Sequence, residues 1–559
     1  MTSDELGFQP DDKALYFLPL GGAGEIGMNL NLYGHAGKWL MVDLGISFGD
    51  ESMPGVDVIM ADPAFIRQRS EDLVGLVLTH AHEDHLGAVQ YLWAELGCPI
   101  YTTPFTAAVL RSKIHERGLV GRIKIHEVPA SGQVTIGPFE IEMVGVTHSV
   151  PEAQALVIRT AAGTAVHTGD WKLDPRPVVG PTTNEQVLAR IGDQGVCALL
   201  GDSTNAMVPG HSGSESDVRA CLEQLFGQFT NRIVVTCFAT NVSRLESVAV
   251  AAERHGRRVG LVGRSLWRIF EAARSVGYLK KIPEFLSEHD VAYLPRNQAV
   301  LVCTGSQGEP RSALARLASG DHPQVSLEPG DVVIFSSRDI PGNETAVANI
   351  QNQLVRRGIE VITSEQMPVH VSGHPARDEL ALLYHLLRPK VAAPIHGERR
   401  HLIEHARLAQ ECQVPQTIIP ENGTILRLAP GPAEAVGVVH TGRLAVDGKR
   451  LIPLDAGVMK TRHRIMHNGA AFVTVVVNSR GELTQAPKVA VMGLLDEQAE
   501  PSALLDAIDA VREAVAHLPK TTRLEDDDAL RQEARTALRR CFQHSHGKKP
   551  QTVVHLIRV

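Results

Sequence analysis

The sequence has few cysteines, no long apolar segment and no excess of basic residues. Its seven cysteines are scattered singly among 559 residues. Without a Cys-x-x-Cys pair they support neither a disulfide framework nor a cysteine-type zinc module, so we expect a reducing, cytoplasmic setting. No apolar run approaches the roughly 18 residues of a membrane span, and residues 1–10 lack the basic-then-apolar pattern of a signal peptide.

The net charge is -8, because 63 acidic residues outnumber 55 basic ones. This balance argues against a protein that binds any polyanion through its overall charge. It leaves nucleic acid open as a substrate, since metal ions and a local basic channel can supply a positive field. The sequence has neither internal repeats nor a low-complexity tail, and its length fits two to four domains with sizeable cores.

One short stretch holds four candidate metal ligands, His80, His82, Asp84 and His85. It follows the apolar run 73–78, which is too short for a helix and predicts a buried strand. Imidazole and carboxylate together suit zinc or manganese. We expect His80 and His82 to lie on one side of an extended loop, with Asp84 and His85 turning back toward a second ion. The alternatives are a solvated surface loop and a single structural metal site.

The N-terminal region carries a glycine-rich turn. Residues 22–27 match Gly-x-Gly-x-x-Gly, a dinucleotide-binding fingerprint that requires a helix immediately afterwards. Residues 28–33 instead alternate like a strand and residues 39–43 predict another, so we interpret the motif as a tight turn. Asp43 closes this second strand. It is either a turn former or a partner that orients a metal ligand, and we favour the second role.

Further polar residues follow strand-like segments. His148 follows residues 141–146, and Asp170 follows residues 164–167. A lone histidine is more often a core or surface residue than a ligand. Because the four-residue cluster cannot complete a two-ion site, we predict that His148 completes one ion and that Asp170 bridges both. Asp202, at the end of another strand, is either a helix cap or a site carboxylate.

From about residue 207 the pattern changes to alternating helices and strands. The strand-like runs are Ile233–Thr236, Val259–Val262, Ala299–Cys303, Asp331–Phe335 and Ile359–Thr363. Helix-like segments lie between them, for example 244–255 and 266–276. This alternation predicts a parallel α/β module of roughly 160 residues.

Two later motifs add candidates. Residues 370–374 are His-Val-Ser-Gly-His, and residues 394–398 are Pro-Ile-His-Gly-Glu. The pair Ser372-Gly373 permits a close backbone approach, so it either binds a phosphate through its N–H groups or is simply a turn.

A separate segment begins past residue 442. Residues 471–477 and 552–559 predict strands, and residues 530–542 predict a helix. A preceding helix is predicted by one apolar face, formed by Leu504, Ile508, Val511, Val515 and Leu518. We interpret the acidic run 525–528 as the solvated start of a helix rather than as a recognition tail.

Taken in order, the glycine turn, Asp43, the His-x-His-x-Asp-His stretch, His148 and Asp170 resemble the metallo-β-lactamase fold. With the inserted module, Asp202 and the two later motifs, nearly the whole chain resembles the β-CASP group of metallo-β-lactamase nucleases and, more narrowly, the bacterial ribonuclease J family. Residues 201–205 and 304–310 closely resemble sequence motifs of that family. Thr240 replaces an expected serine but keeps a hydroxyl.

This resemblance implies an α/β fold with three parts. Residues 1–206 and 369–445 would form an αββα metallo-β-lactamase sandwich. Residues 207–368 would form an inserted parallel α/β β-CASP domain, and residues 446–559 a small α+β C-terminal domain. The resemblance also implies a homodimer or homotetramer through the last domain and contacts with proteins of RNA decay. The lack of a long apolar run predicts no membrane association.

Residues and resemblance together predict a site for two divalent metal ions, with zinc expected and manganese as the alternative. The predicted ligands are His80, His82 and His148 for one ion, Asp84, His85 and His396 for the other, and Asp170 between them. We expect Asp84 also to act in catalysis and Asp43 to orient ligand histidines. His374 would stabilise or protonate the leaving oxygen. On resemblance alone, Asp202 would hold His374 or another imidazole.

The implied activity is RNA hydrolysis, 5′-to-3′ from 5′-monophosphate ends and also internally, in rRNA processing and mRNA decay. RNA would enter between the catalytic and inserted domains. The predicted RNA- or phosphate-binding residues are Ala239, Thr240, Asn241, His370, Val371, Ser372, Gly373 and His374. The alternatives are a DNA-directed or other metal-dependent hydrolase on the same scaffold, and a non-catalytic RNA-binding scaffold.

Overall fold

The computed structural model describes residues 11–50, 52–496 and 498–559, so the signal-peptide expectation for residues 1–10 lies outside it. The chain divides into two compact units, one comprising residues up to 47 and 60–441, the other 48–59 and 442–559. The strands flanking the short segment 48–59 are β5 (Ile46–Phe48) and β6 (Val58–Ala61). None of the helices in the described part has the length and hydropathy of a membrane-spanning segment.

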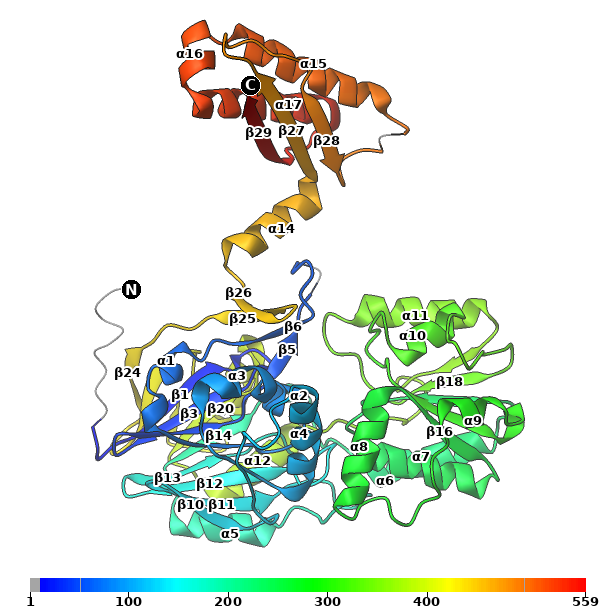
Figure 1. Ribbon diagram of the computed structural model, residues 1–559. Helices are drawn as coiled ribbons and strands as arrows, with labels where there is room; N and C mark the ends of the chain where they lie inside the picture. Colours follow the sequence, from blue (N-terminus) through cyan, green and yellow to red (C-terminus); the bar gives the residue numbers. More distant parts are fainter. Residues whose placement is uncertain (1–10, 51, 497) are drawn as a thin grey trace. The chain divides into compact units, whose positions relative to one another are not determined.

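The first unit contains a sandwich of two large β-sheets (Figure 1). The first sheet has eight strands, in the order β24 (Glu434–Val438), β23 (Thr424–Ala429), β1 (Leu15–Gly21), β3 (Leu30–His35), β4 (Lys38–Val42), β7 (Leu73–Val77), β8 (Ile100–Thr102) and β9 (Ile125–Glu127). The second has seven, in the order β10 (Gln133–Ile136), β11 (Phe139–Gly145), β12 (Gln154–Thr160), β13 (Gly163–His167), β14 (Ala198–Asp202), β20 (Val391–Ile395) and β22 (Gln416–Thr417).

Strand alternation builds a core on both sides of the second sheet. Leu156 and Ile158 on β12 pack between the sheets against first-sheet residues such as Phe17. Val157, one position along, packs outward against helices, because side chains alternate between faces along a strand. The outer helices are α1 (Ala64–Arg67), α2 (Glu83–Leu86), α3 (Val89–Leu96), α4 (Pro104–Glu116), α5 (Glu185–Gln194), α12 (Arg377–Leu387) and α13 (Arg399–Glu411).

The glycine turn is followed by strands and not by a helix, which removes the dinucleotide-binding alternative. Its short strand β2 (Ala23–Gly24) pairs with β21 (Gly397–Glu398), the segment directly after His396. This pairing brings the two ends of the sandwich domain's sequence together. The apolar spacing of residues 86–96 predicts one helix, but the structure has a break there, since α2 ends at Leu86 and α3 begins at Val89. The Ala88 N–H donates to the carbonyl of Leu44 at 3.0 Å and not along the helix.

The inserted domain has five parallel strands flanked by helices, as the sequence predicted. The strand order is β16 (Arg258–Val262), β17 (Ala299–Cys303), β15 (Ile233–Thr236), β18 (Val332–Phe335) and β19 (Glu360–Ile362). The helices are α6 (Glu215–Phe226), α7 (Val242–Arg254), α8 (Arg264–Ser275), α9 (Glu288–Ala292), α10 (Ala313–Ser319) and α11 (Glu344–Arg356).

A buried ion pair ties the inserted domain to the returning chain. Arg244, on α7, donates from Nη2 to both carboxylate oxygens of Glu215 at 3.1 Å. It also donates from Nη1 to the carbonyls of Ser336 at 2.6 Å and Val369 at 3.1 Å. Both side chains are almost fully buried. The pair thus fixes the position of the segment that leads into residues 370–374.

Replacing Arg244 with methionine is expected to lower the free energy of unfolding by about 3–5 kcal/mol, because Glu215 would remain buried without a partner. Chemical denaturation followed by circular dichroism measures this. The matched control is Arg274→Met, whose ion pair with Glu284 is solvent-exposed and should contribute about 1 kcal/mol or less. Equal losses in both variants would contradict the role given to the buried pair.

The second unit begins with the hairpin of β25 (Arg443–Asp447) and β26 (Arg450–Pro453), followed by α14 (Gly457–Asn468). A three-stranded sheet follows, in the order β28 (Lys488–Met492), β27 (Ala470–Val477) and β29 (Gln551–Arg558). Helices α15 (Pro501–His517), α16 (Lys520–Glu525) and α17 (Asp527–His546) complete the unit. The predicted α/β fold class, with its α+β C-terminal part, is confirmed. The acidic run does start a helix, since Asp526 caps α17 by accepting from the N–H of Ala529.

Candidate metal centre

The His-x-His-x-Asp-His stretch lies directly after β7, as predicted. The strand ends at Val77, and helix α2 starts at Glu83 with His82 as its N-cap. His80 and His82 therefore belong to the loop, whereas Asp84 and His85 belong to the first helical turn. This change of backbone direction separates the four side chains into two pairs.

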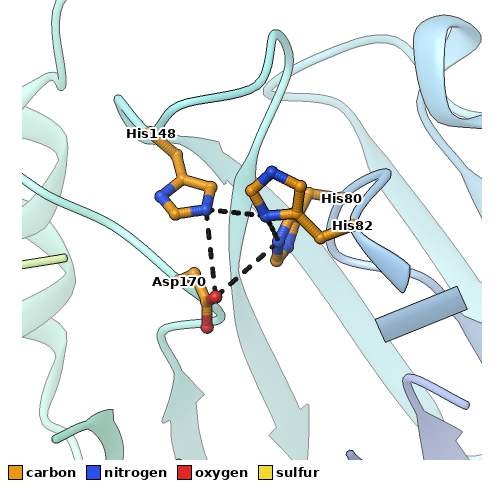
Figure 2. Close-up of side chains that lie close together, drawn as sticks. All are labelled: His80, His82, His148 and Asp170. Carbon is orange, nitrogen blue, oxygen red and sulfur yellow. Dashed lines mark hydrogen bonds and ion pairs between the residues drawn. The ribbon is translucent and has the colours of Figure 1, made fainter. Parts of the chain in front are cut away.

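The first pair forms a cluster with two residues that follow strands of the second sheet (Figure 2). The His82 Nδ1 atom lies 3.0 Å from Nε2 of His80 and 3.0 Å from Nε2 of His148. The Asp170 Oδ2 atom lies 3.8 Å from each of those two Nε2 atoms. Four potential ligand atoms thus converge on one point.

The second pair forms a similar cluster with Asp170 and His396. The His85 Nε2 atom lies 3.5 Å from Asp84 Oδ2 and 3.2 Å from Asp170 Oδ2. The His396 Nε2 atom lies 3.7 Å from Asp84 Oδ2 and 3.5 Å from Asp170 Oδ1. Asp170 belongs to both clusters, one carboxylate facing ligand atoms on two sides.

These spacings fit divalent metal ions. Four ligands at about 2.0–2.1 Å from one zinc ion stand roughly 3.3 Å apart in a tetrahedron, and the separations above lie on both sides of that value. Two buried atoms, Asp170 Oδ1 and His396 Nε2, have no hydrogen-bond partner among the described residues. A buried polar atom without a partner is costly unless another species satisfies it. The clusters therefore form a metal-binding site.

Outer hydrogen bonds orient the ligand histidines. Asp43 accepts at Oδ2 from the His85 Nδ1–H at 2.7 Å and from the Thr79 hydroxyl at 2.9 Å. Because the Thr79 hydroxyl hydrogen is used there, its oxygen accepts from the His80 Nδ1–H at 3.0 Å. The Nε2 lone pairs of His80 and His85 are thereby left for metal. Asp43 adopts a left-handed conformation at φ 63°, a strained geometry typical of functional sites.

Replacing Asp43 with asparagine is expected to weaken metal binding by about 10–100-fold. The neutral amide is a weaker acceptor than the carboxylate for the hydrogen bonds from His85 and Thr79, so it orients the ligand rings less firmly. Titration with zinc against a competing chelator measures the affinity. Asp72→Asn, at an exposed ion pair with Lys38, is the control. Unchanged zinc affinity in the Asp43 variant would show that this carboxylate does not orient the ligands.

His148 is oriented by the predicted serine-glycine turn. Its Nδ1–H donates to the carbonyl of Gly373 at 2.6 Å. A Cβ at position 373 would lie 2.7 Å from the His148 ring, so only glycine permits this approach. Burial, together with the neighbouring His82, lowers the pKa of His148. It is therefore neutral near pH 7, as a ligand imidazole must be.

Asn29 is a further residue of the site, one that the sequence did not predict. Its Nδ2 donates to the backbone carbonyl of Asp84 at 3.0 Å, and its Oδ1 accepts from the His396 Nδ1–H at 3.1 Å. It thus joins two ligand-bearing segments more than 300 positions apart in the chain. The available signal was a polar residue in the predicted strand 28–33, since a buried amide requires partners.

His374 lies beside the clusters and pairs with Asp202. Its Nδ1–H donates to Asp202 Oδ2 at 2.8 Å, and the same nitrogen lies 3.9 Å from Asp170 Oδ2. Burial opposes protonation of His374, but the carboxylates of Asp202 and Asp170 outweigh it and raise its pKa to about 9. The ring therefore carries two N–H groups near neutral pH.

A second histidine stabilises the turn after Asp202. The hydroxyl of Ser203 and Nδ1 of His405 are 2.9 Å apart, and Nε2 of His405 is 2.9 Å from the Tyr384 hydroxyl. Burial lowers the pKa of His405 to about 4, so this imidazole is neutral and can bridge the two hydroxyls. It contributes to the architecture behind the site rather than to the metal clusters.

The predicted phosphate-binding residues divide into two groups. Residues 370–374 lie at the centre: besides Gly373 and His374, the Ser372 hydroxyl accepts from Asn205 Nδ2 at 2.7 Å. Residues 239–241 precede α7, where Asn241 Oδ1 accepts from the N–H of Arg244. A cavity of about 60 Å³ is lined by His148 and by residues of both the sandwich and the inserted domain, and none of the predicted phosphate-binding residues lines it.

Comparison with known proteins gives four family matches. Residues 27–225 match the metallo-beta-lactamase superfamily, and residues 230–354 match "Ribonuclease J, beta-CASP domain". Residues 358–418 match "Zn-dependent metallo-hydrolase RNA specificity domain", and residues 457–559 match "Ribonuclease J C-terminal domain".

Individual relatives agree along the whole chain. Ribonuclease J of Sinorhizobium meliloti is 43% identical over 98% of both chains, and that of Mycobacterium tuberculosis is 38% identical over 97% of this chain and 96% of its own. A crystal structure of a protein of unknown function from Enterococcus faecalis, 18% identical, covers 74% of this chain and 100% of its own at a TM-score of 0.54. That last likeness concerns the fold alone.

Proposed function

Since this chain belongs to the ribonuclease J family, we propose that it is a metal-dependent ribonuclease that hydrolyses the phosphodiester bonds of RNA. The strongest support is the position of Asp170, whose carboxylate belongs to both clusters around the His-x-His-x-Asp-His stretch and to a third group with Asp202, His374 and His396. A carboxylate shared by two clusters is typical of sites that hold two cations for phosphoryl chemistry.

We propose two ions per chain, with zinc favoured over manganese because five of the seven ligands are histidines. The ligand sets are those predicted from the sequence: His80, His82 and His148; Asp84, His85 and His396; and Asp170 in both. Divalent cations held by these residues would supply an activated water molecule and positive charge opposite the scissile phosphate. Asp84, which is partly exposed, would also face the attacking water.

The residues around the clusters would position the reacting groups. His374 uses its Nδ1–H on Asp202, which leaves the Nε2–H to donate to the leaving oxygen. Asp202 keeps that ring in place, and Asp43 and Asn29 keep ligand rings in place. Their common contribution is that ligands and proton donor are oriented before RNA binds.

We further propose 5′-to-3′ exonuclease action from 5′-monophosphate ends, together with endonuclease action. In the described structure, the backbone N–H groups of residues 371–373 make no hydrogen bond to protein. Such N–H groups are suited to binding a terminal phosphate. The side chain of Asn241 is held by its capping bond, so its remaining amide hydrogens would face the RNA. Thr240 would contribute its hydroxyl.

The domain limits at 206/207, 368/369 and 445/446 remain our proposal, as do a cytoplasmic location and a role in rRNA processing and mRNA decay. Self-association through the C-terminal domain and contacts with proteins of RNA decay belong to the same proposal.

The decisive experiment presents 5′-labelled RNA, carrying a mono- or a triphosphate, and a DNA strand of the same sequence to the purified protein. We expect mononucleotides from the monophosphorylated RNA, slower release from the triphosphorylated RNA and none from DNA. A chelator should stop the reaction, and added zinc or manganese should restore it.

The variant His80→Ala should be inactive, whereas His115→Ala, an exposed histidine of α4, should behave like the original protein. Cleavage that persists in chelator or in His80→Ala would refute the proposed function. Equal cleavage of DNA and RNA would support the alternative of a DNA-directed hydrolase.

A further inference from the structure

Helix α14 presents an unpaired basic face, although the chain as a whole is acidic. Its twelve residues include three cationic residues and two histidines but no acid. Lys460, His463, Arg464 and His467 are all exposed. Their spacing of i, i+3, i+4 and i+7 places them along one face of the helix.

The fold extends this face with two residues from the far end of the sequence. Lys548 donates from Nζ to the carbonyl of His467 at 2.8 Å, and the N–H of Lys549 donates to Asn468 Oδ1 at 3.1 Å. Both lysines are exposed. We call the six residues Lys460, His463, Arg464, His467, Lys548 and Lys549 the basic stripe.

The cations of the stripe lack the carboxylate partners that some other cations of this unit have within the described residues. Arg462, on the opposite side of α14, pairs with Asp447 at 2.7 Å, and Arg512 on α15 pairs with Asp509 at 2.8 Å. By contrast, Lys460, Arg464, Lys548 and Lys549 form no ion pair within residues 11–50, 52–496 and 498–559.

Helix stability does not explain the stripe. Cations near a helix C-terminus are stabilised by the helix dipole, which accounts for Arg464 and His467. Lys460 lies in the first turns, where the dipole disfavours a cation. The helix buries only Met459, so packing within the unit uses little of its surface.

We propose that the basic stripe is an RNA-binding surface, which contacts backbone phosphates of the substrate outside the metal centre. This inference rests on the proposed ribonuclease function, and charge complementarity supports it. A row of cations without bound carboxylates matches the regularly spaced charges of a single strand. The stripe would increase affinity for long RNAs without taking part in hydrolysis.

The test compares the full-length protein with a quadruple variant, Lys460→Gln, Arg464→Gln, Lys548→Gln and Lys549→Gln. The control variant removes the same charge from exposed cations of α15 to α17, by Arg512→Gln, Lys520→Gln, Arg539→Gln and Arg540→Gln. Substrates are monophosphorylated RNAs of about 6 and about 40 nucleotides. The first is near the lower end of the roughly 4–16 nucleotides that one OB-fold groove covers, and the second is well above it.

We expect the stripe variant to raise KM for the long RNA about tenfold, and to leave kcat and the KM for the short RNA unchanged. The slope of log affinity for the long RNA against log salt should fall by about 2–3, since each lost phosphate contact in a single strand contributes about 0.7. The control variant should change both quantities less than twofold.

Equal weakening in both variants would overturn the proposal, because net charge alone would then explain the effect. It would also be overturned if the stripe variant bound the long RNA normally but changed oligomeric state in sedimentation velocity, or lost binding to phosphatidylserine vesicles. Filter binding measures the affinity of the stripe for the long RNA even if no RNA is cleaved. Failure of the proposed function is measured separately, as absence of cleavage of the short RNA.

Discussion

Replacing Asp170 with asparagine is expected to remove both metal ions and to lower the rate of RNA cleavage by about three orders of magnitude or more. Its Oδ2 lies 3.8 Å from His80 Nε2 in the first cluster and 3.2 Å from His85 Nε2 in the second. The neutral amide removes negative charge from both clusters at once. Loss of several kcal/mol of transition-state stabilisation corresponds to this change in rate. Metal content by mass spectrometry and single-turnover cleavage measure the two effects.

The control for this variant is Asp331→Asn, which changes an equally buried carboxylate in the inserted domain. That side chain accepts from Arg296 and from the N–H of Arg232, so its loss should reduce stability but not metal content. Two bound ions in the Asp170 variant would contradict the assignment of a shared carboxylate ligand.

Replacing His374 with alanine is expected to reduce kcat by about 10²–10⁴-fold, while both metal ions remain bound. The ring contacts Asp202 directly and belongs to neither of the two clusters formed around the His-x-His-x-Asp-His stretch. Removing a proton donor of this kind costs about that much. Single-turnover kinetics with saturating RNA isolates the chemical step.

Asp202→Asn should produce a smaller loss, about 10–100-fold, because it acts by positioning His374. His385→Ala, an exposed histidine on the following helix α12, should leave kcat unchanged. If His374→Ala instead lost metal, and its kcat per bound metal ion equalled that of the original protein, the residue would be a ligand rather than a proton donor.

Most of the metal centre could be predicted because its residues follow strand ends. His80 to His85 form a local motif, and His148 and Asp170 each follow a strand of the second sheet. A sandwich brings such strand ends to one edge. His396 was assigned only through the family resemblance, since a single histidine in a short motif carries little information by itself.

Other features depend on contacts between distant segments and could not be derived from local patterns. Asn29 looked like one polar position in a strand, and its link to His396 comes from the pairing of β2 with β21. His405 is one polar residue on an amphipathic helix, a pattern more typical of a surface or core residue. Lys548 joins α14 only because β29 pairs with β27.

The domain pattern was predictable for a related reason. Strands of the inserted domain are continuous apolar runs because a parallel sheet is covered on both faces. Their positions were therefore visible without any contact information. The break between Leu86 and Val89 was missed because apolar spacing continues across Gly87 and Ala88, whereas the hydrogen bond from the Ala88 N–H to Leu44 depends on the tertiary structure.

The most direct test of the central claim is anomalous X-ray diffraction at the zinc edge, from crystals of the protein grown with zinc. We expect two peaks about 3.5–4 Å apart. One should be contacted by His80, His82 and His148, the other by Asp84, His85 and His396, with Asp170 touching both. A single peak, or peaks contacted by other residues, would contradict the assignment.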